Sequence, residues 1–323
     1  MTENDVAQAL MPLIEETIAE QVNTFAKEPV PSVLYHYTDG PGLIGILESQ
    51  SLWATSIDFL NDPNEVSYGT KLIADEIEKM NRSEDPYFLS LSFMMDFVEK
   101  DRKSNENLFT NRYVISFCEK AEVLSQWRAY GKNGTGYCIG FAFEGGTSIG
   151  THPDEILGDH FADYGRPRQI LYDGDMQREI MRASMLKIQK LATDRLKEYS
   201  IDPSSDFAFR VYSSIGRKIV IELLPLIKKP EFHEEREWRI LAHHNPTISN
   251  LRFRTSRNIV TPYLKTGFYI DRGGETLPAE VPVAEILVGQ ALNYGRAFVG
   301  LKHLASSHGY DKTEIKRSTI EFV

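Results

Sequence analysis

Three short segments of this chain combine residue types that could bind or activate a polar substrate. The first segment ends a predicted strand directly before a predicted helix start and reads Leu34-Tyr35-His36-Tyr37-Thr38. At such a place, side chains and free backbone donors can meet a polar ligand, and His36 could hydrogen-bond a ribose or an amide. The structural alternative is that His36 is a satisfied core histidine and that Thr38 only caps the helix.

The second segment is Glu235-Arg236-Glu237-Trp238-Arg239, which has the character of a strand. Because side chains alternate between the two faces of a strand, Glu235, Glu237 and Arg239 are expected to project together. Trp238 then points into a core. Two carboxylates and a guanidinium on one face form a polar cluster that could carry chemistry, but a solvated strand edge protected by charge has the same pattern.

The third segment is a turn-rich loop or short helix that contains Trp127-Arg128 and Tyr130. Arg128 could clamp a phosphate, and Trp127 or Tyr130 could stack on a ring. Trp127 as a core anchor, with Arg128 paired to a carboxylate, is the alternative interpretation.

Other chemistry has little support in the sequence. His233 and the pair His243-His244 lack the helical spacing of a zinc hydrolase, so we expect no metal. Cys118 and Cys138 each lie inside a strand-like run and are interpreted as structural. The chain contains no Walker loop, dinucleotide glycine fingerprint or nucleophile elbow.

The composition is that of an ordinary globular protein, with 41% hydrophobic and 25% charged residues among 323. A net charge of −10 argues against a broad electrostatic footprint for duplex DNA or an anionic membrane, although a local basic groove stays open. No apolar run is long enough to cross a bilayer, and the acidic N-terminus does not resemble a signal peptide. We therefore expect a cytoplasmic protein with no membrane contact.

Residues 1–30 are predicted to form an amphipathic helix, since apolar residues recur every three or four positions from 5 to 27. Its face of Leu10, Leu13, Ile14 and Ile18 should pack on the body or on a second copy, which would make a homo-oligomer.

The remaining residues, 31–323, are predicted to form a single α+β domain. Strand-like runs occur near 33–37, 52–55, 113–118, 137–143, 168–172, 238–242, 252–254, 259–263, 286–288 and 313–316. A helical insertion at about 174–227 interrupts them, and a helix is expected near 292–306. Few strictly alternating βαβ units are present, which favours α+β over a doubly wound sheet.

Taken in order, these segments resemble the bacterial family called domain of unknown function 2971. The resemblance runs from about residue 33 to the C-terminus. It rests on Leu34 to Thr38, Gly42 to Leu47, Leu52 to Thr55, Leu60-Asn61-Asp62 with Glu65, Ser116 to Cys118, Ser125 to Gly131 with Gly136, and Phe232 with Glu235 and Glu237 to Arg239.

The opening segment and the late glutamates are also similar to those of the ADP-ribosyltransferase fold, which includes bacterial toxins, and a role in phage defence is a related expectation. This resemblance implies a split, mainly antiparallel sheet with NAD, as substrate, lying across it. His36, Tyr37 and Thr38 would orient its riboses or carboxamide, and Arg128, with Trp127 and Tyr130, would lie near the pyrophosphate. Glu237 would stabilise the oxocarbenium-like ribose, and Glu235 would activate the acceptor.

The resemblance implies transfer of ADP-ribose to a protein, to a nucleic acid or to water. Two other classes stay open. A non-catalytic nucleotide-sensing or partner-binding effector would keep the His36 and Arg128 cluster without needing Glu237 for turnover. A nuclease or metal hydrolase would need divalent cations.

Overall fold

The structure is a computed structural model of the chain. It describes residues 2–25, 29–60, 64–80, 85–104, 112–144, 146–156, 161–244, 251–256 and 258–320, so Asn61 and Asp62 of the family motif lie outside the described residues. The chain forms two compact units. We call them the helical unit (residues 1–28, 60–110 and 171–232) and the sheet unit (residues 29–59, 111–170 and 233–323). Residues 31–323, predicted as one domain, contribute to both.

The helical unit consists of long helices, and the predicted N-terminal helix is one of them. Its described helices are α1 (Glu3–Phe25), α3 (Asn64–Met80), α4 (Pro86–Ser104), α6 (Gly174–Glu198) and α7 (Asp206–Leu223). Helix α1 packs against α6 and α7 with Leu10, Ile14 and Ile18 buried and Leu13 partly buried. The apolar face of α1 is therefore covered within the chain, and a homo-oligomer would need another surface.

The helical pair predicted at 174–227 is confirmed, and its two starts are capped by side chains. Asp173 accepts a hydrogen bond from the backbone N–H of Met176 at 2.8 Å, and Ser205 accepts one from Ala208 at 3.2 Å. Such caps satisfy backbone donors that the first helical turn leaves unpaired. None of the described helices combines the length and apolar character that a membrane crossing needs.

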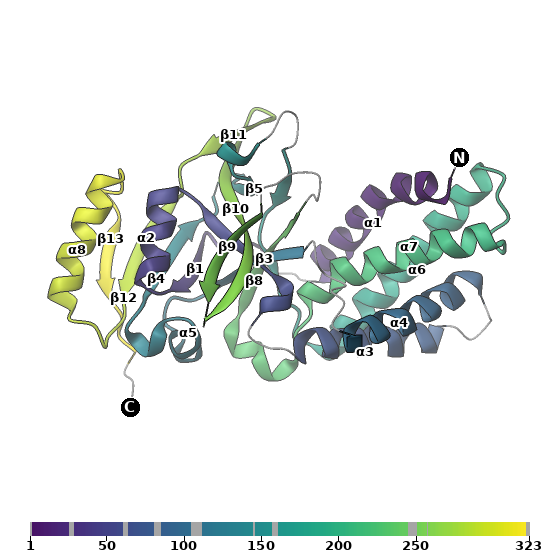
Figure 1. Ribbon diagram of the computed structural model, residues 1–323, viewed down its shortest axis with the longest axis horizontal. Coiled ribbons are helices and arrows are strands. Elements are labelled where there is room, and N and C mark those ends of the chain that lie inside the picture. Colours follow the sequence, from purple (N-terminus) through teal and green to yellow (C-terminus); the bar gives the residue numbers. More distant parts are fainter. Residues whose placement is uncertain are drawn as a thin grey trace. The chain divides into compact units, whose positions relative to one another are not determined.

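The sheet unit holds one mixed sheet of thirteen strands among the described residues (Figure 1). All strand pairs are antiparallel except β12 with β13, so the predicted α+β class is confirmed. The strands are β1 (Val33–Thr38), β2 (Leu52–Ser56), β3 (Arg112–Cys118), β4 (Tyr137–Ala142), β5 (Ser148–Thr151), β6 (Asp163–Gly165), β7 (Arg168–Gln169), β8 (Glu237–His243), β9 (Leu251–Ser256), β10 (Ile259–Arg272), β11 (Glu275–Ala279), β12 (Val283–Val288) and β13 (Glu314–Arg317).

Strand β3 is the point at which the sheet opens. One edge of β3 pairs along its whole length with β8. The other edge pairs with β1 only at Cys118, through Tyr35, and with β2 only at Val114 and Tyr113. Between these two contacts β1 and β2 diverge, so the edge of β3 from Ile115 to Phe117 has no partner strand on that side. We call this gap the sheet opening.

Short helices cover the two faces of the sheet. Helices α2 (Gly40–Ser49) and α8 (Tyr294–Ser307) each bury one apolar face, which includes Leu47 and Leu301, in the core that contains Phe117 and Phe141. Helix α5 (Leu124–Ala129) places Trp127 on the opposite face, against Tyr37. Because successive residues of a strand point to opposite faces, β1 contributes Leu34 to the first core and Tyr37 to the second.

Candidate functional site

His36 fills the sheet opening. Its Nδ1 lies 2.9 Å from the backbone carbonyl oxygen of Ser116, on the edge of β3 that lacks a partner strand. A carbonyl oxygen can only accept, so Nδ1 carries the proton and Nε2 of the neutral ring is left as an acceptor. The ring also meets Phe117 edge-on, with 6.2 Å between centroids. His36 is therefore fixed in one tautomer and orientation.

The charge state of His36 follows from its surroundings. Burial lowers the pKa of His36 below its ordinary value, the hydrogen bond to Ser116 partly opposes this, and the positive charge of Arg254 lowers the pKa further. The imidazole is thus neutral at neutral pH. A neutral His36 can accept a hydrogen bond from a ligand hydroxyl or amide, whereas an imidazolium could only donate.

Arg254, on β9, is the second polar group at the opening, and it was not among the site residues predicted from the sequence. Its Nη2 donates to Thr55 Oγ1 of β2 at 2.8 Å. Its guanidinium carbon lies 5.6 Å from the ring centroid of Trp53 and 6.0 Å from that of Tyr263. The alternation of Arg252 and Arg254 in a strand was the one available signal, and it does not distinguish a solvated strand from an inward-facing cation.

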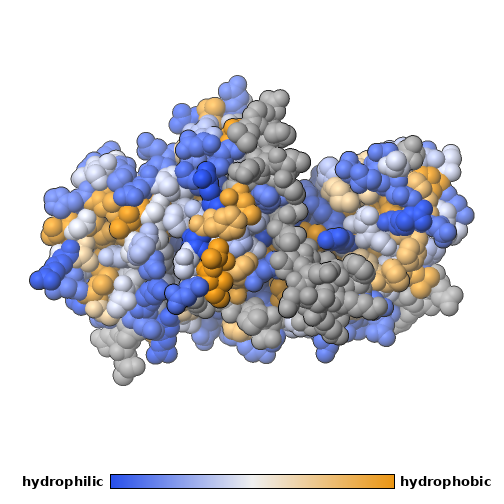
Figure 2. All heavy atoms as spheres, in the orientation of Figure 1, coloured by the Kyte–Doolittle hydropathy of each residue, from blue (hydrophilic) through white to orange (hydrophobic). Residues whose placement is uncertain are grey.

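The hairpin of β9 and β10 exposes several apolar side chains to solvent. Phe253, Ile259 and Val260 are 62%, 57% and 67% exposed, and Figure 2 shows hydrophobic residues gathered over this region of the sheet unit. Arg254 follows Phe253 directly and therefore points to the other side of β9, where it is partly buried. The strand thus turns its cation inward, toward Thr55.

Glu237 forms a bidentate ion pair with Arg239 on the same strand. Arg239 Nε lies 2.6 Å from Oε1 of Glu237, and Nη2 lies 2.9 Å from Oε2. Both side chains are buried, with Glu237 7% and Arg239 2% exposed. The two parallel hydrogen bonds hold the Glu237 carboxylate in one orientation.

The register places this pair two strands away from β1. Glu237 pairs with Cys118 of β3, and Cys118 pairs with Tyr35 of β1, so Tyr35 and Glu237 lie roughly 10 Å apart across two strand spacings. If His36 and Glu237 share one cleft, the two segments that carry them are expected to be neighbours in the sheet. This expectation is wrong, because strand β3 lies between β1 and β8. His36 follows Tyr35 and leaves β1 toward the opposite face, so the side chains of His36 and Glu237 could share one ligand only through the sheet opening.

Glu235 does not belong to the strand that carries Glu237. It ends the short helix η5 (Pro230–Glu235), and β8 begins at Glu237. Between them Arg236 has a positive φ of 42°, which interrupts the extended backbone, so the expected alternation of Glu235 with Glu237 is wrong. The carbonyl of Glu235 accepts a hydrogen bond from Cys118 Sγ at 3.2 Å.

The segment around Trp127 is mainly a core element. Trp127 is fully buried, donates from Nε1 to the carbonyl of Ala121 at 3.2 Å and meets Tyr37 edge-on at 5.2 Å. The hydroxyl of Tyr37 donates to the carbonyl of Lys120 at 2.9 Å. Neither ring is available for stacking on a ligand as the protein stands. Arg128 and Tyr130 are exposed.

Thr38, the last residue of β1, lies beside the helix start but does not cap it. The cap of α2 is Asp39, whose Oδ1 accepts from the backbone N–H of Gly42 at 2.9 Å. Of the predicted site residues, the structure thus puts His36 at the opening and Thr38 at the end of the same strand. It sets Tyr37 and Trp127 in the core on the face that α5 covers.

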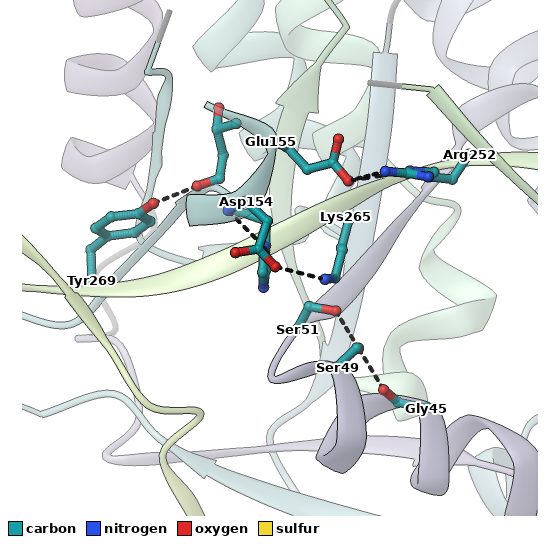
Figure 3. A network of polar contacts seen from close by, with 10 residues as sticks. Gly45, Ser49, Ser51, Asp154, Glu155, Arg252, Lys265 and Tyr269 are labelled. Carbon is teal, nitrogen blue, oxygen red and sulfur yellow. Dashed lines mark hydrogen bonds and ion pairs between the residues drawn. The ribbon is translucent and has the colours of Figure 1, made fainter. Parts of the chain in front are cut away.

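A second polar cluster in the sheet unit surrounds His152, and Figure 3 shows that its charged members are directed at one another. Glu155 accepts from Arg252 at 2.7 Å, and Asp154 lies 3.7 Å from Lys265 Nζ. Burial lowers the pKa of His152, and the nearby Lys265 lowers it further. Because these charges are matched within the cluster, we interpret it as structural. No group of acidic, histidine or cysteine side chains in the described ranges is arranged to hold a metal ion.

Comparison with known proteins identifies one family. The model of a family described as protein of unknown function (DUF2971) matches residues 126–240, which confirms over this stretch the resemblance seen in the sequence. The matched stretch runs from Gln126, beside Trp127, to Ile240, one residue beyond the Glu237–Arg239 pair. Neither the search of curated proteins nor the search of solved structures gives a match.

Proposed function

We propose that the sheet opening binds NAD and that the protein cleaves its nicotinamide–ribose bond, passing ADP-ribose to a macromolecule or to water. The observation that carries this proposal is the position of His36, a neutral histidine fixed by Ser116 in the gap between β1 and β2. The resemblance to ADP-ribosyltransferases implies a split, mainly antiparallel sheet with NAD lying across it and His36 orienting its riboses or carboxamide, and the position of His36 supports the proposal.

The roles of the residues follow from their chemistry. The free Nε2 of His36 would accept a hydrogen bond from a ribose hydroxyl or from the carboxamide of nicotinamide. Glu237 would supply the negative charge that favours the oxocarbenium-like ribose formed as nicotinamide leaves. Arg239 would orient the Glu237 carboxylate through their two hydrogen bonds. Glu235 is the proposed group that activates the acceptor, and its place outside β8 leaves it on a different segment from Glu237.

One observation favours a second candidate, a nucleotide-binding effector without turnover. Both carboxylate oxygens of Glu237 already accept a hydrogen bond from Arg239. An ion pair of this kind reduces the negative charge that Glu237 can offer to a ligand. The same pair could instead only stabilise the buried face of β8. In that case His36 and its surroundings would bind a nucleotide and Glu237 would only stabilise the sheet.

The two candidates differ in whether nicotinamide is released. Purified protein should be incubated with NAD, with and without a bacterial extract as a source of acceptor, and free nicotinamide measured over time. The first proposal expects release by the wild type and none by Glu237→Gln at equal folded fraction. Binding of NAD without release, with or without extract, supports the effector. A wild type that neither binds NAD nor releases nicotinamide contradicts both.

A further inference from the structure

Arg254 is a cation whose charge has no carboxylate partner within the described part of the chain. Its Nη2 donates to the Thr55 hydroxyl at 2.8 Å, and its Nε is buried without a hydrogen-bond partner. Burial lowers the pKa of Arg254, and the electrostatic influence of its surroundings, including Asp39, only partly offsets this effect. A buried donor without a partner and a charge without a counter-ion both destabilise the folded protein, so we look for a functional reason for Arg254 at this position.

Asp39, the carboxylate whose charge influences Arg254, is already engaged in other contacts. Asp39 uses Oδ1 to cap α2 at Gly42, and its Oδ2 lies 3.8 Å from Lys132 Nζ. Arg252 gives a clear contrast, since it precedes Arg254 by two residues on β9 and therefore points to the same face. Its guanidinium donates to Glu155 at 2.7 Å (Figure 3). The chain thus balances one arginine of this strand and leaves the other available to a ligand.

Two aromatic rings hold the Arg254 guanidinium in place. The rings of Trp53 and Tyr263 lie 5.0 Å apart at an interplanar angle of 33°, and the guanidinium carbon is within 6.0 Å of both centroids. A guanidinium over ring faces gains cation–π attraction and loses freedom to reorient. Its planar set of donors then matches two oxygens of a phosphate better than a flexible lysine would.

We propose that Arg254 binds the diphosphate of a dinucleotide whose ribose or carboxamide contacts His36. This inference rests on the proposed function, because it names the part of the NAD molecule that Arg254 would hold. Arg254 interacts electrostatically with His36, since its positive charge contributes to lowering the pKa of His36. In a chain with a net charge of −10, an anionic ligand needs such a local cation.

Calorimetric titration of the full chain with ADP-ribose, inorganic pyrophosphate and adenosine tests the inference. Arg254→Gln should weaken ADP-ribose and pyrophosphate binding about 10- to 100-fold, the equivalent of one lost charge-assisted hydrogen bond. Adenosine binding should not change, because adenosine lacks the anion. Arg252→Gln is the matched control, because Arg252 lies on the same strand and already pairs with Glu155, and it should bind ADP-ribose as the wild type does.

Thermal melting separates a binding role from a structural one. Because Arg254 has no acidic partner, Arg254→Gln should melt at or above the wild-type temperature. A melting temperature lowered more than in Arg252→Gln would assign Arg254 to the fold and overturn the inference. Unchanged ADP-ribose affinity in Arg254→Gln, or no binding of ADP-ribose and pyrophosphate by the wild type, would overturn it as well.

The outcomes also separate this inference from the proposed function. Arg254-dependent binding of ADP-ribose by a protein that releases no nicotinamide would keep the anion site and remove the transferase proposal. Nicotinamide release with the same KM for NAD in Arg254→Gln and in the wild type would keep the enzyme and remove the anion site.

Discussion

Glu237 and Arg239 form a bidentate ion pair inside β8, with contacts of 2.6 and 2.9 Å between their charged groups. Two residues apart on one strand, they share a face, and both are nearly inaccessible to solvent. The pair can therefore be structural or catalytic. The two interpretations differ in how substitution of Glu237 or of Arg239 changes stability and turnover.

The first prediction concerns the stability of this pair. Glu237→Gln removes the carboxylate that accepts two hydrogen bonds from the buried Arg239 guanidinium, so the free energy of unfolding should fall by about 3 kcal/mol. Arg239→Gln should destabilise the protein by a similar amount, because it removes the guanidinium that donates two hydrogen bonds to the buried Glu237 carboxylate. Urea unfolding of the two variants beside the wild type measures both values. Losses below about 0.5 kcal/mol, as at a typical surface position, would contradict the burial of the pair.

Activity then distinguishes the roles of the two residues. If Glu237 acts on the substrate, Glu237→Gln should release no nicotinamide at a temperature where it is fully folded. Arg239→Gln, compared at the same folded fraction, should keep part of the turnover because the carboxylate is still present. If both folded variants release nicotinamide at the wild-type rate, neither charge takes part in the reaction.

The second prediction concerns the hydrogen bond between His36 and Ser116. Asn at position 36 can place its amide N–H near the position of Nδ1, so His36→Asn should keep a donor for the Ser116 carbonyl and remain within about 1 kcal/mol of the wild type. His36→Ala removes the donor and should cost about 1–3 kcal/mol. Both variants lose the Nε2 acceptor, so both should bind ADP-ribose or NAD more weakly. Unfolding curves and calorimetry on the pair measure these effects, and normal NAD binding by His36→Asn would remove His36 from the site.

Much of the sheet unit could be predicted from local patterns, whereas the site around Arg254 could not. Alternation and turn residues locate β1, β2 and β3 to within a residue or two. In β10 only residues 259–263 were predicted of a strand that runs from Ile259 to Arg272, because Lys265 and Gly267 interrupt its apolar character. Strand β5 is four residues long and contains a glycine, and it was missed for the same reason.

The position of Arg254 depends on long-range pairing. Its contact with Thr55 joins residues 199 positions apart, through β10, which pairs with both β2 and β9. Strand alternation alone says that Arg252 and Arg254 share a face, but only the neighbouring strands decide which of them meets a carboxylate. His36 was found more easily, because a histidine at a strand end just before a helix is a local signal.

The third prediction concerns the pH dependence of folding. Burial depresses the pKa of His36 and of His152 below the ordinary value of 6.5. The unfolded chain therefore takes up protons near pH 6.5 that the folded protein does not, and stability present above this pH is lost as the pH falls through the folded-state values. Urea unfolding at pH 7.5 and 5.5 should show lower stability at the acidic pH. His36→Asn should reduce the difference, because it removes one of the two histidines whose pKa is depressed by burial.

The last prediction concerns the segment that contains Trp127 and Arg128, which lies in the matched family region. Trp127 is fully buried against Tyr37, so Trp127→Ala should lower the free energy of unfolding by about 3–5 kcal/mol through lost burial and the cavity left behind. Trp127→Phe keeps most of the apolar volume and should cost less. Arg128 is exposed, so Arg128→Ala should change stability by no more than about 0.5 kcal/mol.

Urea unfolding and ADP-ribose titration on these variants separate a core segment from a binding segment. A core segment predicts that folded Trp127→Phe and Arg128→Ala bind ADP-ribose normally, whereas weaker binding by Arg128→Ala with unchanged stability would move the anion contact from Arg254 to Arg128.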